Sequence, residues 1–211
     1  MAASRNSLEV IPDISSVDCQ EQQQTAAVVT RRLDVFSELI ASHGSVEIAP
    51  YVHAPAEIFE AFFAFAGFAA DETVVEIGSG DGRLLLETAR RAVPVTGFEI
   101  DPEAIADCRA RLARATAEEA SRITLRDEDA FSPAEGADVF WAKVDVVYAY
   151  LTPRGMKQIW ADLVRRLRPG TRVISIQFQP PGQQPTHRQE KFSYVDKTGA
   201  RCDFTFFEYL M

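Results

Sequence analysis

The residues in this sequence whose types and spacing best suit chemistry are three alternating glycines, Gly78, Gly80 and Gly82, with Glu76 two positions ahead of them. A short apolar run precedes the glycines and helix formers follow them, a pattern that predicts a buried strand, a turn and a helix. Glycines at such a turn let the backbone approach a ligand, and the free N–H groups that begin the helix favour an anionic group. The pattern therefore predicts a nucleotide-type site that holds a phosphate or a carboxylate.

The glycine spacing argues against two common nucleotide loops. A dinucleotide fingerprint places its third glycine at position 83, which is Arg83 here. The phosphate loop of NTPases places Lys and then Ser or Thr after its glycines, and this chain has no such pair there. The order is instead acid-x-Gly-x-Gly-x-Gly.

Two further acids are suited to holding a nucleoside. Glu99 lies 21 residues after Gly78, near the end of a second apolar run, where a carboxylate can accept both hydroxyls of a ribose. After a third such run, an acid can accept from an adenine amino group, and Phe131 can stack on the ring. Three acids stand at 127–129, so the spacing alone leaves the choice among them open.

Alternating strands and helices are expected to position these residues. Strands are predicted near 74–77, 93–100, 123–126, 143–151 and 171–178, and helices near 55–65, 83–90, 102–117 and 156–167. A period-2 run at 192–195, a turn at 196–199 and a run at 202–210 predict a terminal antiparallel hairpin. This order predicts an α/β fold, a mostly parallel sheet with helices on both faces. Ligands of such sheets bind at the carboxyl ends of the strands, where the chosen residues lie.

Side chains on three predicted helices are assigned from their spacing. The aromatic helix after Pro55 and the amphipathic helix at 156–167 are expected to face the core. The arginines of the helix at 102–117 are expected to form a solvated face. The side chains expected in the core are Ile58, Phe59, Phe62, Phe63 and Phe65 of the aromatic helix and Met156, Ile159, Trp160, Leu163, Val164 and Leu167 of the amphipathic helix. The arginines expected on the solvated face are Arg109, Arg111 and Arg114.

The region before this domain differs in pattern. Residues 1–20 are polar and aperiodic, which predicts disorder, and residues 21–48 show a helical period, which predicts an N-terminal helical extension. Such a helix could cover the ligand, pack on the domain or meet a partner, and packing is the preferred interpretation. The α/β domain is expected over 49–211.

Composition narrows the class of protein. The 211 residues carry 22 Lys and Arg against 31 Asp and Glu, a formal net charge of −9 that disfavours a general nucleic-acid binder. Three scattered cysteines without paired spacing indicate neither a disulfide framework nor a zinc site. No apolar run has membrane-spanning length, and the first 24 residues lack the features of a signal or transit peptide. The cytoplasm is the expected location.

Five stretches of the chain carry a resemblance to a known family. The glycine motif is similar to the first motif of class I S-adenosylmethionine-dependent methyltransferases. Together the stretches resemble the protein-lysine methyltransferases that modify the mitochondrial adenine nucleotide translocator and the c-ring protein of ATP synthase, and their bacterial relatives. These in turn resemble the Dot1 type of histone-lysine methyltransferase. The stretches are Pro50–Val52, Glu76–Arg83, Gly97–Pro102, Leu151–Pro153 and Leu167–Ser175.

The resemblance implies a Rossmann-like seven-stranded fold and S-adenosylmethionine as the cofactor, with no metal. It implies that the glycine motif meets the methionyl part, that Glu99 and Ile100 hold the ribose side, and that Asp129 is the acid that holds adenine. The cofactor-binding residues expected on this basis are Glu76, Gly78, Ser79, Gly80, Gly82, Glu99, Ile100, Asp129, Ala130 and Phe131.

The resemblance also implies a lysine side chain of a protein as the methyl acceptor. A lysine must arrive neutral to accept a methyl group, and an aromatic, water-poor pocket favours that state. Tyr51 and Tyr150 are expected to shape the pocket, although each could be a packing residue. His53 is a candidate proton acceptor or a structural side chain. A small-molecule or RNA methyltransferase and a non-catalytic cofactor-binding subunit remain alternative functions, and mitochondria remain an alternative location.

Overall fold

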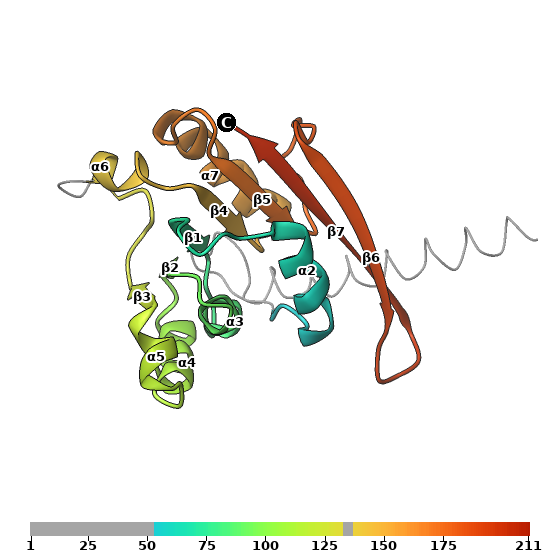
Figure 1. Ribbon diagram of the computed structural model, residues 1–211. Coiled ribbons are helices and arrows are strands. Elements are labelled where there is room, and N and C mark those ends of the chain that lie inside the picture. Colours follow the sequence, from blue (N-terminus) through green and yellow to red (C-terminus); the bar gives the residue numbers. More distant parts are fainter. Residues whose placement is uncertain (1–52, 133–136) are drawn as a thin grey trace, which may run out of the picture. The chain divides into compact units, whose positions relative to one another are not determined.

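The computed structural model describes residues 53–132 and 137–211 of the chain. Its strands are β1 (Val74–Ile77), β2 (Val95–Phe98), β3 (Ile123–Arg126), β4 (Val146–Ala149), β5 (Arg172–Ile176), β6 (Arg188–Val195) and β7 (Arg201–Leu210). They form one seven-stranded sheet in the order β3-β2-β1-β4-β5-β7-β6 (Figure 1). Strands β1 to β5 pair in parallel, whereas β7 is antiparallel to β5 and β6 is antiparallel to β7. The predicted α/β fold with a terminal antiparallel hairpin is confirmed.

Helices cover both faces of the sheet. One core cluster joins α2, α3 and α4 to side chains such as Val74 and Tyr148, and the other joins α6 and α7 to Val75 and Val147. Neighbouring strand residues point to opposite faces, so each short buried strand contributes to both clusters. The helical segments are η1 (Ala56–Ile58), α2 (Phe59–Ala66), α3 (Arg83–Arg90), α4 (Pro102–Leu112), α5 (Ala117–Ser121), α6 (Ala137–Trp141) and α7 (Pro153–Arg166).

Two helices begin directly after strand ends and fix the geometry of those ends. Asp101 caps α4, because its carboxylate accepts from Glu103 N at 2.7 Å and Ala104 N at 3.1 Å. Thr152 caps α7 by accepting from Gly155 N at 3.2 Å. Each cap is followed by a proline at the first helical position, which suits its fixed φ. The chain therefore leaves β2 and β4 along defined paths.

A buried acid joins the terminal hairpin to helix α2. Glu208 on β7 is 1% exposed and accepts from Arg172 Nε at 2.8 Å and Arg188 Nε at 2.7 Å. The same two guanidinium groups donate onward to the carbonyls of Ala66 and Phe65, at the end of α2. Because helix carbonyls there lack intrahelical partners, the arginines satisfy them while Glu208 supplies the counter-charge.

Several predicted boundaries need correction. The helix predicted at 102–117 ends at Leu112, and α5 follows it as a separate element. The strands predicted at 93–100, 143–151 and 171–178 are shorter at both ends, and α6 is an additional helix between β3 and β4. The aromatic helix packs in the core as expected, with Phe59 only partly buried, whereas Val164 is 57% exposed and does not join the buried face of α7.

Some sequence predictions lie outside the described part of the chain. These are the disordered segment 1–20, the helical extension 21–48 and the first residues of the domain predicted over 49–211. Within residues 53–132 and 137–211, none of the helices has the length and apolar composition needed to cross a membrane.

Candidate active site

The glycine loop joins the end of β1 to the start of α3 in a conformation that requires glycine. Gly78, Gly80 and Gly82 have φ values of 74°, 54° and 74°. A Cβ on Gly78 would lie 2.7 Å from Leu151 Cδ2, and one on Gly82 would lie 2.4 Å from Cys108 Sγ. Positive φ and close neighbours both exclude larger residues. The loop is thereby held between the end of β4 and helix α4.

Glu99 is bound to this loop. One carboxylate oxygen accepts from Gly80 N at 2.8 Å, and the other accepts from Ile100 N at 2.8 Å and Asp101 N at 3.0 Å. Three backbone donors thus hold the carboxylate at the carboxyl end of β2 beside the glycines. The structure brings these two predicted parts of the site together, at the place where a doubly wound sheet binds its ligand.

Two features of this region suit the adenosyl group of the implied cofactor. Ile100 follows Glu99 directly and is 49% exposed, so it offers apolar surface for a flat ring beside the ribose position. Ser79 Oγ is buried in the loop and has no hydrogen-bond partner among residues 53–132 and 137–211. The alternating glycines, the fixed carboxylate and this unsatisfied hydroxyl fit a polar ligand with an apolar ring.

The segment predicted to hold adenine follows β3. Asp129 accepts from Phe131 N at 2.9 Å, and Trp141 Nε1 donates to Ala130 O at 3.2 Å. The Phe131 ring stacks on Trp141, with centroids 5.3 Å apart and an interplanar angle of 14°. One face of Phe131 is therefore already covered by protein, which leaves Ile100 as the more open apolar surface.

Glu76 has a different environment from the other predicted cofactor residues. It is 3% exposed, and its Oε2 lies 3.0 Å from Tyr148 Oη, which in turn lies 3.1 Å from Thr88 Oγ1. Burial, together with the nearby carboxylates of Glu99 and Asp81, raises the pKa of Glu76 well above its usual value, against the smaller opposing effect of Tyr148. This environment favours the protonated form of the carboxyl group.

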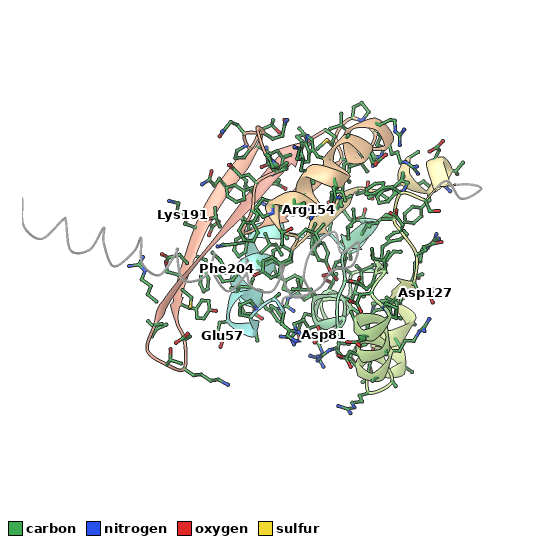
Figure 2. The ribbon with its side chains drawn as sticks, turned by 180° about the vertical axis from the view of Figure 1, so that it is seen from behind. Glu57, Asp81, Asp127, Arg154, Lys191 and Phe204 are labelled. Atoms are coloured by element: carbon green, nitrogen blue, oxygen red, sulfur yellow. The ribbon has the colours of Figure 1, made fainter. Side chains whose placement is uncertain are left out.

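Asp81, inside the glycine motif, is the centre of an ion-pair network that the sequence did not predict (Figure 2). Its carboxylate is bound by Arg83 Nη2 at 2.8 Å and Arg111 Nη2 at 2.6 Å. Burial alone would raise the pKa of Asp81, but these two arginines lower it to about 2. Arg111 also donates to Asp81 O at 2.8 Å, so its assignment to a solvated face was wrong.

His53 joins the edge of this network. Its Nδ1 lies 3.0 Å from Arg83 Nη2 and 3.4 Å from Asp81 Oδ2. A guanidinium group can only donate, so Nδ1 accepts in the shorter contact and the ring proton resides on Nε2. Arg83 also donates to Ala54 O at 3.1 Å, and this arrangement favours a structural role for His53.

The residues predicted to meet the methyl acceptor are only partly described. Tyr150 follows β4 at its carboxyl end, is partly buried and has its ring 6.1 Å from the ring of Phe204 on β7. Tyr51 lies outside the described residues. Arg111 and Leu151 were missed because they reach the loop from 30 or more positions away, whereas an acid inside the glycine motif was a visible signal for Asp81.

Comparisons with known proteins give three findings. The model of a family described as the ANTKMT methyltransferase domain matches residues 76–187. The ATP synthase c-subunit lysine N-methyltransferase of Mus musculus is 30% identical over 114 residues, which are 54% of this chain and 43% of that protein. The protein-lysine N-methyltransferase of Saccharolobus islandicus is 27% identical over 138 residues, 64% of this chain and 81% of that protein. The chain thus matches less than half of the mouse relative's length.

A solved structure agrees with the fold. The RNA methyltransferase of Salinibacter ruber, crystallised with S-adenosyl-L-homocysteine, superposes with a TM-score of 0.59 at 26% identity. The match covers 75% of this chain and 93% of that one.

Proposed function

The chain belongs to the family of the ANTKMT methyltransferase domain, and we propose that it transfers the methyl group of S-adenosylmethionine to a lysine side chain of a protein. The observation that carries this proposal is the Glu99 carboxylate hydrogen-bonded to Gly80 in the glycine loop. The names of the mouse and Saccharolobus islandicus relatives, both lysine N-methyltransferases, support the choice of acceptor.

The cofactor site is built from backbone and one carboxylate. S-adenosylmethionine would supply a methyl carbon already activated by its sulfonium, so the protein has mainly to bind and align. Glu99 is held in place to accept the ribose hydroxyls, and Ile100 offers a surface for adenine. The glycine loop allows the methionyl part to approach the backbone.

The acceptor site lies at the carboxyl ends of β4 and β5. Methyl transfer to lysine needs a neutral amine, and a pocket of aromatic side chains that excludes water lowers the pKa of an amine. Tyr150 and Phe204, with rings in contact, supply two walls of that pocket. His53 is not the base in this mechanism, because its Nδ1 faces Arg83.

An RNA acceptor is the second candidate, because the Salinibacter ruber neighbour is named an RNA methyltransferase. The net charge of −9 argues against it, since binding RNA requires clustered basic side chains. A small-molecule acceptor and a non-catalytic cofactor-binding subunit are the remaining alternatives.

Transfer of tritiated methyl from S-adenosylmethionine into a cell extract tests the proposal. We expect label in a discrete protein band that protease removes and nuclease does not. Glu99→Ala should weaken cofactor binding, measured by calorimetry, about 10- to 100-fold, because hydrogen bonds to a charged group are worth about 1.5–3 kcal/mol. Glu103→Ala, a change to an exposed acid on α4, is the matched control and should bind normally.

The outcomes separate the alternatives. Label that nuclease removes would replace the lysine acceptor with RNA, and label in small molecules would exclude a protein substrate. Cofactor binding without label in any fraction would favour the non-catalytic role. Unchanged affinity in Glu99→Ala would refute the ribose assignment while leaving the family intact.

A further inference from the structure

Gln177 has a strained backbone at the end of β5. Its φ is +71°, and Phe178 N donates to Ile176 O at 2.9 Å, which makes residues 176–178 a γ-turn of the rare type with positive φ. Of the positive-φ positions in the described residues, only Gln177 and Ala92 are not glycine. A long side chain in this conformation is uncommon and points to a requirement for that side chain.

Strand β7 holds the turn in place and fixes the orientation of the Gln177 amide. Gln177 N donates to Thr205 O at 2.7 Å, and Thr205 N donates to Gln177 Oε1 at 3.2 Å. Since a backbone N–H can only donate, the atom that faces it must be the amide oxygen. Ser175 Oγ also donates to Phe178 O across the turn. The Nε2 group of Gln177 has no hydrogen-bond partner within the described ranges.

The turn lies beside the parts of the site where a methyl acceptor would enter. Strands β4 and β5 are neighbours and pair Ala149 with Ser175. Gln177 follows the carboxyl end of β5, and Leu151, which packs on Gly78, follows the carboxyl end of β4. With strands about 4.8 Å apart, Gln177 lies roughly two strand spacings from the glycine loop. On its other side, Thr205 adjoins Phe204, whose ring lies 6.1 Å from the ring of Tyr150.

We propose that Gln177 binds the methyl acceptor by donating its Nε2–H groups to a main-chain carbonyl of the polypeptide that carries the lysine. This rests on the protein acceptor proposed above. Nε2 offers only donors, and main-chain carbonyls are the acceptors that every polypeptide presents, whatever its sequence. The strained turn keeps the amide at the carboxyl end of β5, and the hydrogen bond from Thr205 N prevents the amide from rotating.

Gln177→Glu tests the donors with least change of shape. A carboxylate oxygen can still accept from Thr205 N, while an acceptor oxygen replaces Nε2. With nuclease-treated, desalted extract protein as the acceptor, we expect the protein concentration for half-maximal methylation to rise at least 10-fold. Calorimetric affinity for S-adenosylmethionine should stay within twofold, because the residue touches no part of the cofactor site.

Two glycine variants exclude backbone effects. Gln177→Gly removes the amide but relieves the positive φ, and it should show the same rise in half-saturating acceptor. Ala92→Gly relieves the backbone strain at the other non-glycine residue with positive φ. Ala92 precedes the amino end of β2, at the edge of the sheet opposite the glycine loop, so this change should leave methylation unchanged.

The results distinguish this inference from the proposed function. Absence of label with the wild-type enzyme would refute the protein acceptor itself. Label with the wild type and an unchanged half-saturating concentration in Gln177→Glu would overturn the role of Gln177 alone. A lower half-saturating concentration in Gln177→Glu would also overturn it, because it would place a cation of the acceptor, rather than a carbonyl, at this position.

Discussion

At the scale of single residues, Glu76 shows how burial raises the pKa of an acid within a cofactor motif. Thr88 Oγ1 donates to Leu84 O at 2.8 Å and lies 3.1 Å from Tyr148 Oη. Tyr148 Oη donates to Glu76 Oε2 at 3.0 Å, and the Glu76 side chain is otherwise buried. Burial raises the pKa of Glu76 well above its usual value in spite of this hydrogen bond.

Glu76→Gln should therefore change how stability depends on pH. The wild-type native state keeps a proton above pH 4.5 that the unfolded chain has lost, so its free energy of unfolding falls as pH rises toward the native pKa. The free energy of unfolding of the wild type falls by at most about 1.4 kcal/mol per pH unit for this reason. The variant shows no such fall, because the Gln side chain does not titrate. Urea unfolding at pH 5, 6, 7 and 8 should show the variant gaining stability over the wild type. A constant difference across that range would mean that Glu76 is ionised.

At the scale of elements, the glycine loop depends on helix α4 as much as on its own residues. Cys108 lies under Gly82, and its thiol is inert because burial, with the neighbouring carboxylates, raises the pKa of Cys108 to about 12. Arg111, one turn further along α4, holds Asp81. Helix and loop thus form one packed unit.

Gly82→Ala should destabilise the protein by about 3 kcal/mol, since it combines backbone strain with overpacking against Cys108. Gly67→Ala is the matched control, because Gly67 has φ +54° but a Cβ there would meet nothing within 4 Å. Denaturant unfolding should show a smaller loss for Gly67→Ala. Adding Cys108→Ala should recover part of the Gly82→Ala loss, and equal losses at the two glycines would argue against the contact.

The sequence was informative wherever a local pattern determines an element. The run at 123–126 was located correctly, and so was the hairpin at 192–210, except that β6 begins at Arg188, four residues before the predicted run. The cap of α5 was also readable, because Thr116 and Glu119 have the spacing of a capping box, and it was overlooked. Helix α6 has only five residues, too few for a periodic pattern.

Other features depend on contacts between distant residues. The insertion of β7 between β5 and β6 cannot be derived from alternation alone, nor can the bond between Gln177 and Thr205 across 28 positions. Glu99 and the glycines could be placed together because their spacing is fixed within one strand–helix–strand unit, and their binding of the cofactor stays a prediction. The assignments of Glu76, Asp129, Phe131 and Tyr150 to binding or catalysis stay predictions, as does that of Tyr51.

At the scale of the whole molecule, Glu208 connects the terminal hairpin, β5 and helix α2 through its two arginines. Removing one partner of a buried ion pair leaves the other charges uncompensated, which costs several kcal/mol. Glu208 itself is buried, and its cluster joins segments that are far apart in sequence.

Glu208→Gln should therefore lower the free energy of unfolding by about 3 kcal/mol. This is the lower end of the usual cost of breaking a buried ion pair, because Arg188 is partly exposed to solvent. Asp203→Asn breaks a surface pair with Arg201 on the same strand and should cost less than about 1 kcal/mol. Urea unfolding followed by circular dichroism measures both. Similar small losses would show that the buried cluster contributes little to stability.

The topology of the sheet also bears on how the domain folds. The central pairing of β1 with β4 brings Glu76 beside Tyr148, which are 72 positions apart. Closing so long a loop is slow, because its entropy is lost before the contacts form. Since Leu151 at the end of β4 forms one wall of the glycine loop, the cofactor site is complete only after this long-range step. An early folding intermediate that contains only β1, α3 and β2 would have the motif but not the binding site.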